Sequence, residues 1–84
     1  MAPERTYEQR LVAEALALDA IELLCDIMAT EGVNQSELAR RLGVTPPSIH
    51  FALKGKYMPS LATVARMAHA MGYELTFAIK RMPE

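Results

Sequence analysis

The chain has 84 residues but only one cysteine, no tryptophan and few aromatic side chains. A single cysteine, Cys25, excludes an internal disulfide and a cysteine-rich zinc site. No apolar stretch is long enough to span a bilayer and no signal-peptide pattern is present, so we expect a cytoplasmic protein without membrane contact.

Motifs for catalysis are also missing from the chain. It has no Walker loop, no glycine-rich nucleotide motif and no nucleophile elbow. His50 and His69 lie on different predicted helices, and neither has a carboxylate partner at a motif spacing. We therefore expect no enzyme activity, no cofactor and no metal site.

Charge is distributed unevenly along the chain, although the net charge is only −1. Residues 1–31 carry two basic and seven acidic side chains, whereas residues 32–84 carry seven basic and three acidic ones. A locally basic segment suits contacts with phosphates, which release counterions from nucleic acid. The length allows one small domain with a modest core, for which association of subunits is a common supplement.

The stretch from residue 4 to residue 31 predicts one long helix or two joined helices, because it contains no proline or glycine and is rich in alanine and leucine. Its apolar residues form a broad face of two rows: Leu11, Ala15 and Leu18, and Leu16, Ala20, Leu24, Ile27 and Met28. The second half should pack under the elements that follow. The half before Ala17 either wraps a partner subunit or extends the domain core.

Residues 34–54 have the pattern of two short helices joined by a glycine turn. Asn34 or Gln35 can cap the first helix, whose apolar face is formed by Leu38, Ala39 and Leu42. Gly43 then provides a residue that adopts a left-handed conformation without steric cost. This arrangement predicts a helix-turn-helix, whose second helix can enter a DNA major groove.

The second short helix has its own start signal, with Thr45 as the cap and Pro46 at the first helical position. Ile49 and Leu53 should face inward. The outer and leading faces then comprise Thr45, Pro46, Pro47, Ser48, His50 and Phe51. Lys54 and Lys56 follow the helix and are the best candidates for phosphate contacts.

This segment resembles the helix-turn-helix of the lambdoid phage repressor and Cro family, the XRE type. The residues that carry the resemblance are Gln35, Leu38-Ala39, Leu42-Gly43-Val44, Ser48-Ile49 and Gly55-Lys56. In that family a glutamine matching Gln35 bonds a DNA phosphate, and the leading residues of the second helix read bases. The resemblance implies DNA contacts for Gln35, Pro46, Pro47, Ser48 and Phe51. With the candidates named from their placement on or after the second helix, the expected DNA-binding set is Gln35, Thr45, Pro46, Pro47, Ser48, His50, Phe51, Lys54 and Lys56.

The base-reading positions depart from the polar residues that are usual in the family. Pro46, Pro47 and Phe51 form no bidentate hydrogen bonds, but they can pack against thymine methyl groups. Readout should therefore depend on Ser48, His50 and apolar contacts, or partly on DNA shape.

The last part of the chain predicts a helix over residues 60–71, capped by Ser60, followed by a strand over residues 73–80. Leu61, Val64, Ala65, Ala68 and Met71 should form the inner face of that helix. In the strand, four apolar residues alternate with smaller or polar ones: Tyr73, Leu75, Phe77 and Ile79. A lone strand needs a partner, either the same strand of a second subunit or the edge of its own domain. Cro proteins and several antitoxins of this fold dimerise through such a strand.

These patterns together predict a mainly α, lambda-repressor-like helix-turn-helix bundle, a single domain over residues 1–84, whose C-terminal β-strand pairs across a dimer. We expect a homodimeric, sequence-specific DNA-binding transcriptional regulator, a repressor acting on a palindromic operator. One alternative is an antitoxin that binds a basic toxin through the acidic N-terminal helix and represses its own operon. Another is a protein-interaction module that has lost DNA binding.

Overall fold

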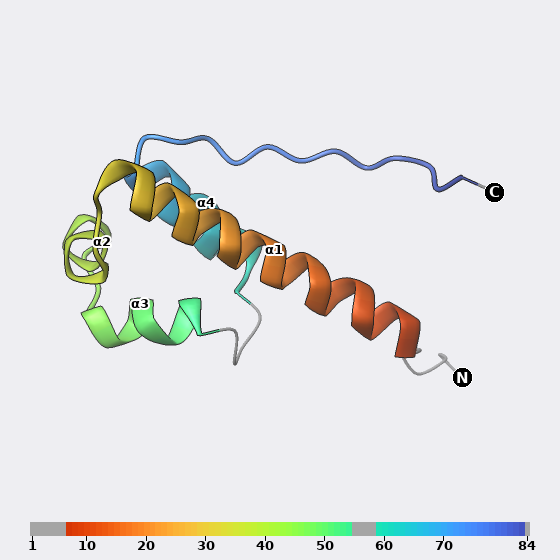
Figure 1. Cartoon of the computed structure of the whole chain (residues 1–84), viewed down its shortest axis with the longest axis horizontal. Coiled ribbons are helices and arrows are strands. Elements are labelled where there is room, and N and C mark those ends of the chain that lie inside the picture. The colour runs from red at the N-terminus through yellow and green to blue at the C-terminus, as the bar shows by residue number, and fades with distance from the viewer. Residues whose placement is uncertain (1–6, 55–58, 84) are drawn as a thin grey trace.

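The computed structural model describes residues 7–54 and 59–83, and this part of the chain contains four helices (Figure 1). They are α1 (Tyr7–Glu31), α2 (Gln35–Leu42), α3 (Pro46–Leu53) and α4 (Leu61–Ala70). The mainly helical fold class is therefore confirmed. Within the described ranges, no helix is both long and apolar enough to cross a membrane.

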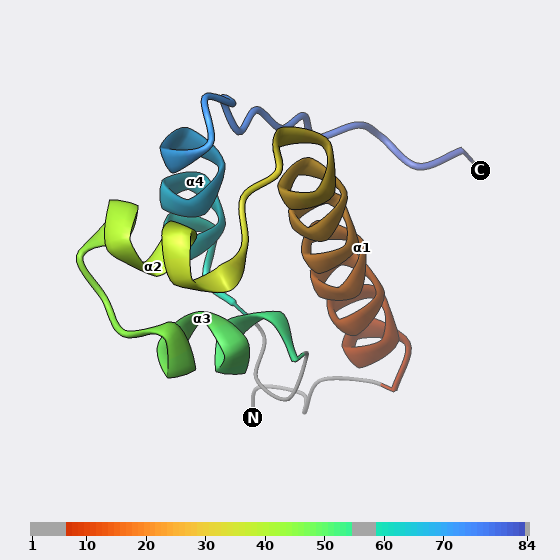
Figure 2. The ribbon, with the colours of Figure 1, turned by 60° about the vertical axis from the view of Figure 1, so that its left-hand side comes forward.

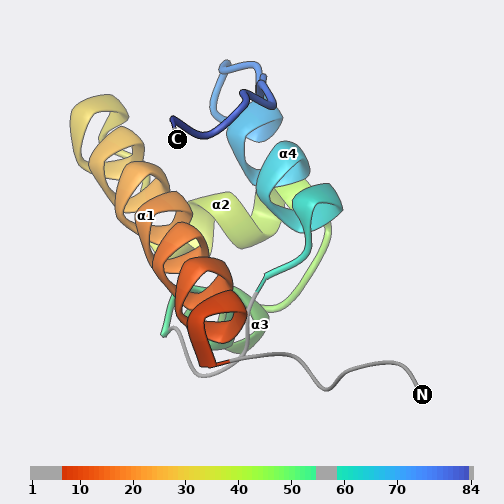
Figure 3. The same ribbon diagram turned by 90° about the vertical axis from the view of Figure 1, so that its right-hand side faces the viewer.

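Helix α1 is a single helix of 25 residues, about 37 Å long at the usual rise per residue. Its C-terminal half packs beside α4, while its N-terminal half projects beyond the other helices (Figures 1 and 3). Only Ile21 and Leu24 of α1 are buried. Leu11, Leu16 and Leu18 are 45%, 69% and 52% exposed, so the first half does not extend the core of its own domain.

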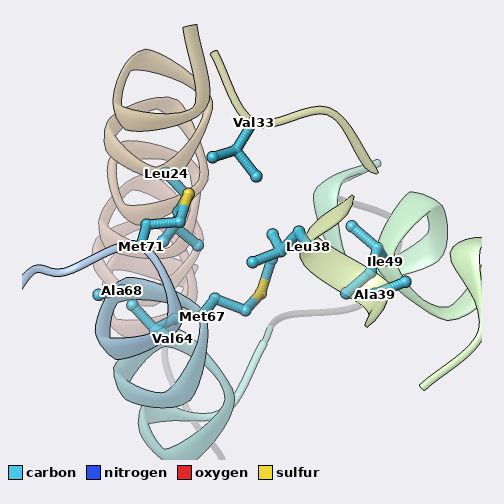
Figure 4. Packing of buried hydrophobic residues seen from close by; sticks show 9 residues of the cluster. All are labelled: Leu24, Val33, Leu38, Ala39, Ile49, Val64, Met67, Ala68 and Met71. Atoms are coloured by element: carbon cyan, nitrogen blue, oxygen red, sulfur yellow. The ribbon is translucent and has the colours of Figure 1, made fainter. Parts of the chain in front are cut away.

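The core is one apolar cluster where α1, α2, α3 and α4 meet. Its buried members are Leu24, Val33, Leu38, Ala39, Ile49, Val64, Met67, Ala68 and Met71. Leu38 of α2 and Met67 of α4 point toward one another at its centre, and both are about fully buried (Figure 4). This contact joins the two-helix motif to the rest of the bundle.

One core expectation for α4 was wrong. Leu61, placed on the inner face from the sequence, is 63% exposed, whereas Met67 is 1% exposed. Leu61 occupies the first position of α4, at the edge of the bundle, where too few neighbours are available to cover it. Ser60 does cap this helix as expected, since its hydroxyl accepts the backbone N–H of Thr63 at 3.1 Å.

The predicted strand at the C-terminus is an extended segment without a strand partner among the described residues. Gly72 has φ = 86°, and the N–H of Tyr73 bonds the carbonyl of Ala68 at 2.9 Å, which turns the chain out of α4. The Tyr73 hydroxyl donates to Glu31 Oε1 at 2.9 Å. Beyond Leu75, which packs against the core, the segment heads in the direction of the N-terminal end of α1 and moves away from that helix toward the C-terminus (Figure 1). The described chain offers no sheet edge for it to cover, and pairing across a dimer stays a prediction.

Candidate nucleic-acid interface

The turn that leads from α2 into α3, seen in Figure 2, contains two backbone hydrogen bonds at the end of α2. Gly43 has φ = 69°, and its N–H donates to the carbonyl of Arg40 at 3.2 Å. The N–H of Val44 donates to the carbonyl of Ala39 at 3.0 Å, and the Val44 side chain packs against the core. Because the end of α2 is satisfied in this way, the direction in which α3 leaves the turn is fixed.

Helix α2 begins with a side-chain cap from Asn34. The Asn34 Oδ1 accepts the backbone N–H of Glu37 at 2.8 Å, so Asn34, and not Gln35, is the cap. Gln35 is the first residue of the helix and is half-buried. Its position at the start of α2 is the one expected for a phosphate contact.

Helix α3 begins differently from the sequence expectation. Thr45 lies at the N-cap with an extended backbone and Pro46 follows as predicted, but the Thr45 side chain makes no capping bond to the backbone. The Thr45 hydroxyl instead lies 3.0 Å from the Ser48 hydroxyl, in a hydrogen bond that either can donate. Since the bond uses one hydroxyl hydrogen, the other remains available for an acceptor on a bound molecule.

The outer face of α3 gathers most of the predicted DNA-binding residues. Ile49 is 3% exposed and Ala52 and Leu53 are half-buried, so the inner side of the helix is occupied by packing. The exposed positions are Thr45, Pro46, Pro47, Ser48, His50, Phe51 and Lys54. Lys56 lies outside the described residues.

Two neighbouring rings stand on this face. His50 and Phe51 have ring centroids 6.5 Å apart at an interplanar angle of 66°, an edge-to-face arrangement. Phe51 is 51% exposed, although an aromatic ring of this size is usually buried. A large exposed apolar side chain beside polar groups suits contact with a base edge that carries a methyl group.

The two arginines of α2 both bond Glu37, and Arg41 also bonds the end of α4. Arg40 donates to both carboxylate oxygens of Glu37, from Nε at 2.9 Å and from Nη2 at 2.6 Å. Arg41 donates from Nε to Glu37 at 3.0 Å and from Nη1 to the carbonyl of Ala70 at 3.0 Å. The hydrogen bonds from Arg40 and then Arg41 lower the pKa of Glu37 to about 2. Arg41 is therefore a link between α2 and the end of α4.

This role of Glu37 was not predicted from the sequence. The signal was present, since arginines three and four residues after a glutamate lie on the same helix face. The hydrogen bond from Arg41 to Ala70 joins residues 29 positions apart, so no pattern of neighbouring residues predicts it. In the described part of the chain, no group of three or more histidine, cysteine, aspartate or glutamate side chains is arranged to hold a metal ion.

Comparison with known proteins points in one direction. A family model described as helix-turn-helix matches residues 27–77, which is more than half of the chain. An uncharacterized HTH-type transcriptional regulator of Methanothermobacter thermautotrophicus is 49% identical over 43 residues, covering 51% of this chain and 62% of that relative. The chain thus spans less than two thirds of the relative's length. No solved structure matches the chain significantly.

Proposed function

This chain belongs to the helix-turn-helix family of the XRE type, and on that premise we propose that it is a sequence-specific transcriptional regulator that binds a palindromic DNA operator as a homodimer. The observation that carries the proposal is the outer face of α3. This face contributes little to the core, yet it combines paired hydroxyls, two exposed rings and a lysine at the end of the helix.

Base recognition follows from the chemistry of that face. The Thr45–Ser48 hydroxyl pair offers a hydrogen-bond donor and acceptors to base edges at the leading end of α3. Pro46, Pro47 and Phe51 offer apolar surface, which suits thymine methyl groups. The operator should therefore include A·T pairs opposite the leading end of α3.

Phosphate contacts hold the helix in register. Gln35 at the start of α2 and Lys54 at the end of α3 flank the base-reading face along the motif. Contacts of this kind position a protein on the duplex and make its affinity depend on salt. Arg40 and Arg41 contribute less, because both guanidinium groups bond Glu37.

The homodimer is supported by the C-terminal segment. Phe77 and Ile79 are 73% and 94% exposed on an extended segment that finds no strand partner among the described residues. Pairing two such segments across a twofold axis satisfies their backbone groups and presents two α3 helices to half-sites about one DNA turn, roughly 34 Å, apart. Occupation of such a site blocks polymerase, which makes the regulator a repressor.

The test is selection of bound sites from random duplex DNA at two salt concentrations, with wild-type protein and Ser48→Arg. Wild-type protein should enrich a palindrome with half-sites about one turn apart. Ser48→Arg should change or abolish the enriched sequence while the protein stays folded. The matched control is Ala15→Arg, which adds the same side chain at an exposed position of α1 and should keep the wild-type sequence. Weak binding without sequence preference by wild-type protein refutes the proposal.

A second candidate function is favoured by the N-terminal half of α1. Exposed Leu11 and Leu18 lie on a helix that also carries several acidic residues, among them Glu8 and Glu14. A basic protein partner, such as the toxin of a toxin–antitoxin pair, fits this surface. If the chain is an antitoxin, it should neutralise the growth inhibition caused by a neighbouring gene. Leu11→Lys combined with Leu18→Lys should abolish that protection, and Ser48→Arg should leave it intact.

A further inference from the structure

An apolar groove of about 470 Å³ opens between α1, the start of α4 and the C-terminal segment. Leu16 and Leu23 of α1, Leu61 of α4 and Phe77 of the C-terminal segment line it, and each is at least 63% exposed. Exposed apolar surface gathered in one concave place indicates a binding partner.

The apolar side chains of the C-terminal segment are also exposed beside this groove. Leu75 and Phe77 line the groove, and Ile79, two residues further along, is 94% exposed. Among the described residues, an uncovered groove and an extended segment without a strand partner therefore lie side by side, so one additional strand next to the segment would cover both.

We propose that this strand is the C-terminal segment of a second copy, paired antiparallel with Phe77 on the twofold axis. The inference rests on the homodimer proposed above and adds its register and the occupant of the groove. Two residues lie opposite each other in this pairing when their numbers lie equally far on either side of 77. Ile79 of the partner subunit then stands beside Leu75, over the groove.

Charge selects this register among its neighbours. With Phe77 on the axis, Glu74 lies opposite Lys80 of the partner subunit on the outer face, while Leu75 and Ile79 pair on the inner face. Opposite charges and apolar pairs directly across antiparallel strands both stabilise the pairing. Each contact occurs twice in a symmetric dimer.

The two nearest registers that keep apolar residues on one face lose the pair of opposite charges. With Thr76 on the axis, Glu74 lies opposite Ala78. With Ala78 on the axis, Glu74 lies opposite Met82. A slip by one residue places apolar against polar positions throughout.

The acidic surface of α1 favours the partner's C-terminal segment over the partner's α1 as the occupant. Helix α1 carries six acidic residues and one basic residue, Arg10, and Asp19 lines the groove itself. Two such helices side by side would repel one another. The C-terminal segment instead brings Arg81 on the same face as Ile79, and the charge of Arg81 is complementary to that surface.

A cysteine scan tests the register, using Thr76→Cys, Phe77→Cys and Ala78→Cys, each combined with Cys25→Ser. Residues directly opposite in an antiparallel pair have Cα atoms about 4.5–5.5 Å apart, within reach of a disulfide. Diagonal neighbours are about 7–8 Å apart, which is too far. Mild oxidation should therefore cross-link the dimer through position 77 and not through positions 76 or 78, as seen by electrophoresis without reductant.

A charge exchange tests the same register without removing the aromatic ring. Glu74→Lys should raise the dimer dissociation constant about tenfold, because two like-charged pairs replace two opposite ones. Adding Lys80→Glu should restore dimerisation. Adding Arg81→Glu, the matched control, should not.

The outcomes separate this inference from the proposed function. A dimer that binds a palindrome but cross-links through position 76 or 78, or at all three positions, overturns the register and leaves the function standing. A folded chain that stays monomeric and selects no palindrome overturns both. A monomer whose groove is filled only by a different protein overturns the second copy as occupant.

Discussion

Leu38→Ala should destabilise the domain severely, because Leu38 is 0% exposed and packs against Met67 at the point where the motif joins α4 (Figure 4). Removing a fully buried leucine costs about 3–5 kcal/mol, since transfer free energy is lost and a cavity remains. The whole domain is expected to have a free energy of unfolding of about 4–12 kcal/mol. The substitution therefore removes a large part of it, and the melting temperature should fall by about 15–30 °C.

The assay is thermal unfolding followed by circular dichroism at one fixed protein concentration, since association adds to stability. Leu18→Ala is the matched control, because Leu18 is 52% exposed on α1 and its truncation should cost less than about 1 kcal/mol. A fall below about 5 °C for Leu38→Ala, or equal falls for the two variants, would refute the packing argument.

Three further predictions concern the motif itself. Hydrogen bonds from the two arginines lower the pKa of Glu37 from 4.5 to about 2. The stabilisation of the folded state by the ionised carboxylate is therefore complete above pH 4.5 and is lost as the pH falls toward 2. In thermal melts Glu37→Gln should be less stable than wild type at neutral pH and should converge with it in acid, and a difference in melting temperature that stays constant with pH would contradict this. Gly43→Ala should lower stability by about 1 kcal/mol through backbone strain alone, because φ is 69° and no atom beyond its two chain neighbours lies within 4 Å of the added Cβ. An unchanged melting temperature counts against this prediction. Lys54→Ala should weaken binding to all DNA sequences and, for a dimer, lower the slope of log affinity against log salt concentration by about 2, as measured by fluorescence anisotropy. Arg66→Ala, on α4, is the control. Equal slopes for wild type and Lys54→Ala would show that Lys54 contacts no phosphate.

Local signals explain why so much of the fold was predictable. Asn34 before α2, Gly43 after it, Pro46 at the start of α3 and Ser60 before α4 each act on their own neighbours, and each marks a helix end in the structure. Apolar spacing likewise identified Leu38 as buried. Such features depend on a few adjacent residues, so no knowledge of the rest of the chain was needed.

The expectations that were wrong or left open depend on contacts between distant parts of the chain. Spacing alone placed Leu61 on the inner face of α4, but whether a position is covered depends on which parts of the other helices lie over it. The broad apolar face predicted for α1 likewise did not indicate that the N-terminal half of this helix projects beyond the other helices. The bond from Arg41 to Ala70 required both helix ends in place.

The sequence predicted which side of α3 is exposed, but it did not predict the hydrogen bonds between the side chains on that side. The exposed side of α3 follows from the inward spacing of Ile49 and Leu53, and it agrees with the structure. The hydroxyl pair of Thr45 and Ser48 was not foreseen, because a threonine at an N-cap was expected to bond the backbone. Pro47 has no backbone N–H, and the N–H of Ser48 donates to the Thr45 carbonyl at 3.0 Å, so the Thr45 hydroxyl bonds the neighbouring Ser48 hydroxyl instead.

Two contacts between distant residues anchor the ends of the bundle to each other. Arg41 ties the end of α2 to the end of α4, and the Tyr73 hydroxyl ties the start of the C-terminal segment to the last turn of α1. The segment therefore departs from a point held at a constant position relative to α3. In a dimer built through that segment, its residues set the separation of the half-sites, whereas the outer face of α3 sets their sequence. Operator spacing and operator sequence would then change through different mutations, so a new target site can be acquired in two independent steps.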